Sequence, residues 1–210
     1  MTKIETWKLY GLIILVSILN VVIVNGIFSD AIYVNTYTGQ MSTEMISKML
    51  SFKSKYAWVN YLLVPILLLV KTGLVAACFW IGSFFSNSKS RFKDYLRLVL
   101  FAETVFIVFS FARTGLLYYY NFQTLTEISQ FQPLTLYSLL DVNNIPGYFH
   151  YPLALVSIPE AIYWGVLVLL LKPLISGNFW DRFGFVAKTY GIGLLIWVSI
   201  VVFVTLNFSS

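Results

Sequence analysis

Five apolar runs dominate the sequence, and each is long enough to cross a lipid bilayer as a helix. A hydrocarbon layer about 30 Å thick takes about 20 apolar residues in helical form. The runs do not alternate apolar with polar residues, which argues against the strands of a membrane β-barrel. The sequence therefore predicts an all-α polytopic membrane helix bundle, organised as a single membrane domain over residues 1–210. The five predicted transmembrane helices cover residues 8–28, 58–85, 95–120, 151–174 and 185–207.

The composition points the same way and limits the partners. Only 11% of the residues are charged, against about 25% in soluble domains, and the mean hydropathy is +0.79. The net charge of +5 comes from basic residues scattered beside the apolar runs rather than from one dense basic face. We therefore expect the lipid bilayer as the main partner, other membrane proteins as candidate partners, and no nucleic acid.

The basic residues also predict an orientation, because Lys and Arg are retained in the cytoplasm. Residues 121–150 contain no Lys or Arg, whereas the turn after the second run is basic. We expect a multi-pass protein of the inner, or cell, membrane with its N-terminus cytoplasmic and its C-terminus outside. The first run is longer than a signal-peptide core of about 7 to 15 residues, so we expect it to be retained. The basic residues that would lie inside are Lys3, Lys8, Lys89, Arg91, Lys93, Arg97, Lys172, Arg182 and Lys188, while Lys48, Lys53 and Lys55 would lie outside and disagree with the scheme.

The segment before the second run is amphipathic. Met45, Met49, Phe52 and Tyr56 follow one another at helical spacing, with Ser and Lys mostly on the other side. This pattern predicts an amphipathic helix that lies in the membrane interface. A solvent-exposed loop helix packed on the bundle is the alternative. Residues 132–152 mix short apolar runs with Asn, Pro and Gly, which predicts a partly structured cap over the outer helix ends.

Four charged residues fall within the predicted spans: Lys71, Glu103, Arg113 and Glu160. An unpaired charge there costs at least about 2.5 to 3.5 kcal/mol, so such residues usually face the interior and pair with one another. Arg113 and Glu160 lie about 10 and 13 Å below the same boundary, at 1.5 Å of rise per residue, so they are the first predicted pair. Lys71 lies near the midplane and needs Glu103 or Glu160 as its partner. We expect one polar cluster of all four residues.

Two uses of this cluster stay open at the level of sequence. It either orients the bundle as a neutralised structural cluster or forms a proton or polar-substrate site. Polar residues on the same predicted helices offer further hydrogen bonds, and Gly73 with Ala77 forms a small-xxx-small pair typical of close helix packing. The polar residues are Asn20, Asn25, Thr72, Ser110 and Thr114.

Motifs of known catalytic chemistry are missing from the sequence. It contains no HExxH, no nucleophile elbow, no phosphate-binding GxxxxGK and no run of acidic metal ligands. We therefore expect no enzymatic activity, no catalytic residue, no cofactor and no bound metal.

The C-terminal half, "PLALVSIPEAIYWGVLVLLLKPLISGNFWDRFGFVAKTYGIGLLIWV", resembles the Yip domain family of five-helix membrane proteins in its bacterial form. Trp164 in a helix after an outer cap, then Lys172, Arg182 and Lys188 around a short basic turn, match that layout over residues 60–205. The "DLYGP" signature of the eukaryotic branch is absent, so the resemblance implies no Rab-GTPase partner. It implies a non-enzymatic accessory or scaffold subunit. A small permease or proton-coupled carrier that uses the four charged residues is the alternative.

Overall fold

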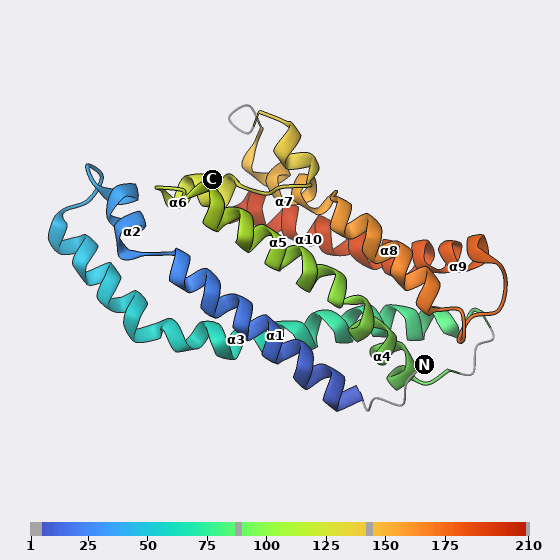
Figure 1. The fold of residues 1–210 in the computed structure, drawn as a ribbon. Helices are drawn as coiled ribbons and strands as arrows, with labels where there is room; N and C mark the ends of the chain where they lie inside the picture. Colours follow the sequence, from blue (N-terminus) through green and yellow to red (C-terminus); the bar gives the residue numbers. More distant parts are fainter. Residues whose placement is uncertain (1–5, 87–89, 142–144, 209–210) are drawn as a thin grey trace.

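A computed structural model describes residues 6–86, 90–141 and 145–208, and the chain there is almost entirely helical (Figure 1). No β-strand forms in these ranges; two isolated bridges occur, one of them between Thr135 and Ser157. The all-α fold class is therefore confirmed. The elements are α1 (Thr6–Ile27), α2 (Asp30–Tyr37), α3 (Thr43–Ser83), α4 (Phe92–Ala102), α5 (Thr104–Tyr120), α6 (Leu125–Gln130), the 3₁₀ helix η1 (Leu136–Leu139), α7 (Gly147–Leu155), α8 (Ile158–Leu170), α9 (Phe179–Val186), the π-helix η3 (Ala187–Gly191) and α10 (Ile192–Phe208).

Four helical stretches in the described part of the chain are long and apolar enough to cross a membrane. They are Thr6–Ile27, Thr43–Ser83, Phe92–Tyr120 and Phe179–Phe208. A fifth apolar helix, α8, has only 13 residues. This arrangement is that of a multi-pass membrane protein.

The second predicted span and the amphipathic segment before it form one helix of 41 residues, α3. The hydroxyl of Ser42 caps its N-terminus by accepting from the backbone N–H of Met45 at 3.3 Å. No break separates the two predicted parts, because the sequence between them holds no glycine or proline. Pro65 lies inside α3, which curves along its length in Figure 1, as expected where a proline removes a backbone hydrogen bond.

The fourth predicted span, residues 151–174, is not one helix but two, α7 and α8. The chain between them pairs with the preceding loop: Leu136 N–H donates to the Val156 carbonyl at 2.8 Å, and Ile158 N–H donates to the Leu134 carbonyl at 2.9 Å. The Ser157 hydroxyl then caps α8 by accepting from the Glu160 N–H at 3.2 Å. Pro159 therefore lies in the first turn of α8, where its missing N–H costs nothing.

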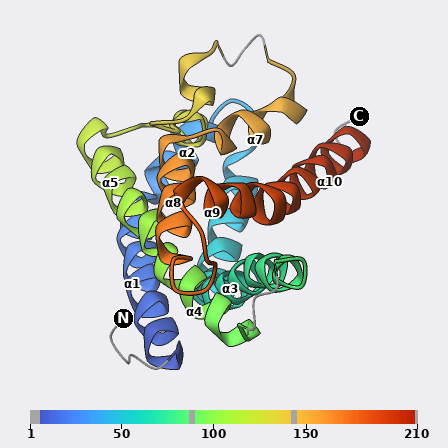
Figure 2. The ribbon, with the colours of Figure 1, turned by 90° about the vertical axis from the view of Figure 1, so that its right-hand side faces the viewer.

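The main apolar core lies where α3, α4, α8 and the π-helix η3 meet. Phe79, Tyr95, Tyr163, Leu167 and Val186 are fully buried there. Figure 2 shows α10 extending away from this core, and none of its side chains is buried. Many large apolar side chains on the long helices are exposed, which suits helices surrounded by lipid.

Glycines allow close helix approach at the core, but not where the small-xxx-small pair predicts it. A Cβ atom on Gly73 would meet nothing within 4 Å, so that prediction is wrong. A Cβ atom on Gly82 would instead collide with Thr189 of the π-helix. The close contact of α3 therefore lies nearer its C-terminus.

Candidate functional site

Lys71 and Glu103 form an ion pair between α3 and the α4–α5 junction. Lys71 Nζ lies 2.9 Å from Glu103 Oε2. The carboxylate side chain is 5% exposed, whereas the lysine side chain is 44% exposed. The ammonium also lies 3.8 Å from the centre of the Phe106 ring, a favourable cation–π distance. Of the two carboxylates predicted as partners of Lys71, the structure therefore shows Glu103 as the one that pairs with it.

Arg113 does not pair with Glu160, so the first predicted pair is wrong. The Arg113 Nε donates to the Phe131 carbonyl at 3.1 Å, and Nη2 donates to the Ile128 carbonyl at 3.4 Å. The segment around α6 folds back over the end of α5 and brings these carbonyl groups within reach. Helix depth alone could not reveal this competing set of acceptors.

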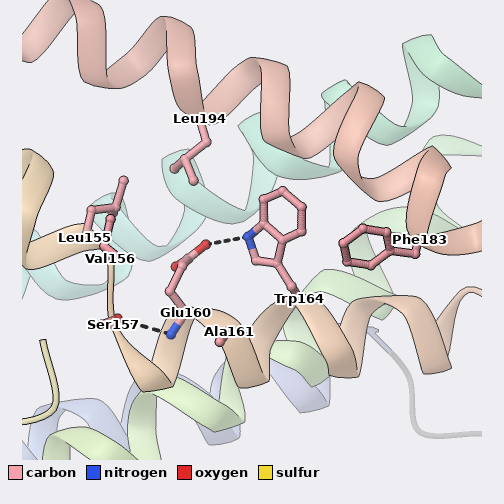
Figure 3. Close-up of a pocket in the computed structure, with 8 residues that line it drawn as sticks. All are labelled: Leu155, Val156, Ser157, Glu160, Ala161, Trp164, Phe183 and Leu194. Atoms are coloured by element: carbon pink, nitrogen blue, oxygen red, sulfur yellow. Dashed lines mark hydrogen bonds between the residues drawn. The ribbon is translucent and has the colours of Figure 1, made fainter. Parts of the chain in front are cut away.

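Glu160 is held by neutral donors on two helices. Its Oε1 accepts from Trp164 Nε1 at 2.9 Å and from the Tyr190 hydroxyl at 2.7 Å. Trp164 stands one turn along α8, and Tyr190 belongs to the π-helix η3, an irregularity that is frequent at functional sites. Figure 3 shows the Glu160 carboxylate and the Trp164 indole turned toward each other.

Aromatic rings separate the Lys71–Glu103 pair from Glu160. The Tyr163 ring packs against Phe106, with ring centres 4.7 Å apart, and against Tyr190, at 5.6 Å. Glu160 therefore makes no direct ion pair with Lys71, although Lys71 and Glu103 are close enough to interact with it electrostatically. Arg113 bonds backbone carbonyl groups instead of either carboxylate.

Two buried polar atoms near the ion pair are Glu103 Oε1 and the Tyr163 hydroxyl. They form no well-aligned hydrogen bond with the described residues, although the Tyr163 hydroxyl lies beside the Glu103 carboxylate. Each such atom costs about 1 to 3 kcal/mol, and most buried polar groups in proteins are bonded. Together with the Lys71–Glu103 pair, these two atoms form the polar part of the bundle interior around Glu103.

A groove opens beside Glu160 between α8 and the α9–α10 end of the molecule (Figure 3). Its volume is about 410 Å³. Glu160 is its one charged residue, and Ser157 lines it at the α7–α8 break. The other lining residues are Leu155, Val156, Ala161, Trp164, Phe183 and Leu194.

Four of the five polar residues expected to assist the charges join α1 to its neighbours instead. The fifth, Thr72, donates its hydroxyl to the Leu68 carbonyl of its own helix at 2.8 Å. Asn20 Nδ2 donates to the Thr114 hydroxyl at 3.3 Å, and the Ser110 hydroxyl donates to Asn20 Oδ1 at 3.2 Å. Asn25 Nδ2 donates to the Tyr61 hydroxyl at 3.2 Å. These bonds connect α1 to α5 and α3, away from Lys71.

Sequence reasoning did not identify Trp164 and Tyr190 as partners of Glu160. The spacing of four residues between Glu160 and Trp164 was a usable signal, because such residues share a helix face. No signal pointed to Tyr190, which stands 30 positions away in the chain.

No group of three or more His, Cys, Asp or Glu side chains that could hold a metal ion occurs within residues 6–86, 90–141 and 145–208. In comparisons with known proteins, no family model, no curated protein and no solved structure matches this chain.

Proposed function

We propose that this chain is a non-enzymatic accessory or scaffold subunit that binds other membrane proteins inside the bilayer. The observation that supports it most directly is Lys71, whose side chain is 44% exposed in the middle of an apolar helix. Its neighbours on α3, Leu67, Val70 and Leu74, are exposed as well. A charged group on such a surface costs free energy in contact with lipid.

A partner helix would remove that cost. An ammonium group has three N–H donors, and Lys71 donates one of them to Glu103 Oε2 at 2.9 Å. A hydrogen-bond acceptor on the partner would use a further donor, and polar contacts of this kind hold membrane helices together. In this proposal, Glu103 holds the Lys71 side chain in position, and the Lys71 ammonium contacts the partner helix.

The topology proposed with this function has five crossings, an N-terminus in the cytoplasm and a C-terminus outside. The fifth crossing would be α7 and α8 together, because α8 alone spans only about 20 Å at 1.5 Å per residue. Residues 43–58 would follow the interface before α3 enters the bilayer. Two of the outer lysines are balanced locally, since Lys48 lies 2.7 Å from Glu44 and Lys53 lies 3.2 Å from Asp30.

Membership of the Yip domain family is part of the same proposal. The helix order supports it, because a helix with Trp164 follows an outer segment and leads through a turn into the final helix. The resemblance places Arg182 in a basic turn, where a solvated side chain is expected. The Arg182 side chain is buried instead.

The experiment removes the ion pair without leaving a lone charge. Lys71→Met alone would strand Glu103, so Lys71→Met is combined with Glu103→Gln. Native electrophoresis of membranes extracted in mild detergent should show the wild type in complexes larger than one chain, and the double variant should shift to the single-chain size. The matched control is Lys48→Met with Glu44→Gln, which removes an ion pair in which both side chains are at least 75% exposed and should leave the complexes intact. A wild type that runs as a single chain would contradict the proposal.

A small permease or proton-coupled carrier is the second candidate. It is favoured by the two buried atoms without a well-aligned hydrogen bond to the described residues, Glu103 Oε1 and the Tyr163 hydroxyl, because buried carboxylates in membranes often form proton relays. Purified protein in vesicles loaded with a pH-sensitive dye separates the two functions. A carrier moves protons across the membrane and loses this flux in Glu103→Gln, whereas an accessory subunit shows no flux in either form.

A further inference from the structure

We propose that the groove beside Glu160 binds a lipophilic organic cation, with the Glu160 carboxylate as its counter-charge. This site lies apart from the exposed Lys71 surface and does not depend on the partner proposed for that surface. It would give the protein a binding function that neither the accessory nor the carrier reading requires.

Within the described part of the chain, no basic side chain forms an ion pair with Glu160. Both groups that bond Glu160 Oε1, the Trp164 indole and the Tyr190 hydroxyl, are neutral. Lys71 is engaged by Glu103 at 2.9 Å. Hydrogen-bond donors favour the ionised form of a carboxylate, so these two donors oppose the effect of burial and favour a negative charge at the wall of the groove.

The second carboxylate oxygen is available to a ligand. No donor among the described residues reaches Glu160 Oε2, and this atom is not among the buried ones. Figure 3 shows the carboxylate between the α7–α8 break and the Trp164 ring, on the side of the groove. A cation in the groove would therefore meet an open acceptor.

The remaining lining selects an organic cation over a metal ion. Hard metal ions take several oxygen ligands, whereas Glu160 and Ser157 are the polar residues of this groove, and the Ser157 hydroxyl already accepts from Glu160 N–H. The rings of Trp164 and Phe183, with centres 6.0 Å apart, offer the faces that attract quaternary and other organic cations.

The size and position of the groove fit a ligand that arrives from the apolar phase. A volume of about 410 Å³ falls in the range of small-molecule sites. Val156 at its rim is exposed and apolar, and so are the neighbouring faces of α8 and α10. A water-soluble amine would lose its hydration at this surface, whereas a cation with an apolar body would not.

Tetraphenylphosphonium is a suitable probe, and its anionic counterpart of the same shape, tetraphenylborate, is the control ligand. Binding to the full chain in maltoside micelles is measured by equilibrium dialysis. We expect saturable binding of the phosphonium to the wild type and an affinity at least tenfold weaker for Glu160→Gln. Tetraphenylborate should show no such loss, and Glu44→Gln, which removes an exposed carboxylate, should bind the phosphonium as the wild type does.

A second variant tests the groove without changing the charge. Ala161→Trp fills the groove while keeping Glu160, and it should also weaken phosphonium binding at least tenfold in protein that elutes as a single species. Equal phosphonium binding by the wild type and Glu160→Gln would overturn the proposal. So would an equal loss of phosphonium and borate binding, because that result indicates general damage to the groove.

The quaternary ammonium of a lipid head group shares this chemistry with a free lipophilic cation. Repeating the measurement in phosphatidylcholine and phosphatidylglycerol vesicles, as the difference between wild type and Glu160→Gln, separates the two sources. A difference that shrinks in phosphatidylcholine assigns the groove to the lipid head group, and one that is equal in both assigns it to a free cation. No difference in either lipid overturns the proposal.

Discussion

Two tyrosines in one neighbourhood have opposite hydrogen-bond states. The Tyr190 hydroxyl donates to Glu160 at 2.7 Å, whereas the hydroxyl of the fully buried Tyr163 forms no well-aligned hydrogen bond within the described part of the chain. Their rings are in contact, with centres 5.6 Å apart. The pair therefore offers a comparison in which ring packing is kept and only the hydroxyl is lost.

Tyr190→Phe should destabilise the protein by about 1.5 to 3 kcal/mol, because it removes a hydrogen bond to a carboxylate. Tyr163→Phe should cost less than Tyr190→Phe, since the Tyr163 hydroxyl lies beside the Glu103 carboxylate without forming a well-aligned hydrogen bond. Thermal unfolding of both variants in detergent measures the difference. A larger loss for Tyr163→Phe than for Tyr190→Phe would show that the Tyr163 hydroxyl has a partner in the working protein.

A buried arginine caps the C-terminal end of α8. Arg182 Nε donates to the Val168 carbonyl at 3.1 Å, and Nη1 donates to the Gly177 carbonyl at 2.8 Å. The last carbonyl groups of a helix have no partners within the helix. The Arg182 guanidinium provides hydrogen-bond donors for carbonyl groups at this end of α8. Arg182→Ala should therefore destabilise the protein by about 1 to 3 kcal/mol.

The control for Arg182→Ala is Lys172→Ala, which removes one positive charge at an exposed position in the turn between α8 and α9. Its stability in the same unfolding assay should stay close to that of the wild type. Equal losses in the two variants would assign the effect to charge rather than to the capping of α8.

At the scale of elements, α3 is held by its C-terminal third, where it meets the π-helix η3. Gly82 faces Thr189 there without room for a Cβ atom, whereas Gly73, nine positions earlier on the same helix, faces open space. The two glycines share a helical backbone and differ only in what lies beside them.

Gly82→Ala should lower the thermal stability, because the added methyl group forces α3 and η3 apart. Gly73→Ala should raise the free energy of unfolding by about 0.5 to 1 kcal/mol, since alanine loses less backbone freedom than glycine in a helix. The two variants are compared by thermal unfolding in one detergent. Opposite signs are expected, and stabilisation by Gly82→Ala would contradict the contact with Thr189.

For the molecule as a whole, the proposed topology predicts the side of the membrane on which each loop lies. Ser86 and Ser138 lie in the loops before and after the helical stretch α4–α5, and Ser176 follows α8; all three are exposed. Ser88, the other natural choice for the first loop, lies outside the described residues. These positions report on two crossings, one by α4–α5 and one by α7–α8.

Single cysteines at these three positions, in a Cys78→Ala background, can be labelled with a membrane-impermeant maleimide. We expect Ser86→Cys and Ser176→Cys to label from the cytoplasmic side and Ser138→Cys from the outside. If Ser176→Cys labels from the same side as Ser138→Cys, α7 and α8 do not cross the bilayer and the bundle has four spans. Labelling of Ser86→Cys and Ser138→Cys from one side would remove the α4–α5 crossing as well.

Hydropathy predicted the positions of the long helices, because membrane insertion depends on local apolar content. Residues 8–28 and 95–120 correspond closely to α1 and to α4 with α5. The break at Val156 and Ser157 was missed, although Ser157, Pro159 and Glu160 form a recognisable helix start. Its cause is pairing with Leu134 and Leu136, a loop contact that no local pattern contains.

The candidate site was predictable only in part, for a similar reason. That a lysine within a predicted membrane span needs a carboxylate follows from electrostatics, and Glu103 meets that need. The partners of Arg113 are backbone carbonyl groups, which every residue carries and which sequence therefore cannot single out. Tyr190 reaches Glu160 from a π-helix, whose register differs from the regular spacing on which helical patterns rest.

The final helix has an evolutionary consequence. Since α10 has no buried side chain, residues such as Leu195, Ile196 and Phe203 are constrained by the surrounding hydrocarbon more than by neighbours of fixed shape. Exchanges among apolar residues there should be nearly neutral and can accumulate, whereas the fully buried Leu167 tolerates few replacements. Mutational drift should therefore be fastest along α10 and slowest in the half of α8 that faces the core.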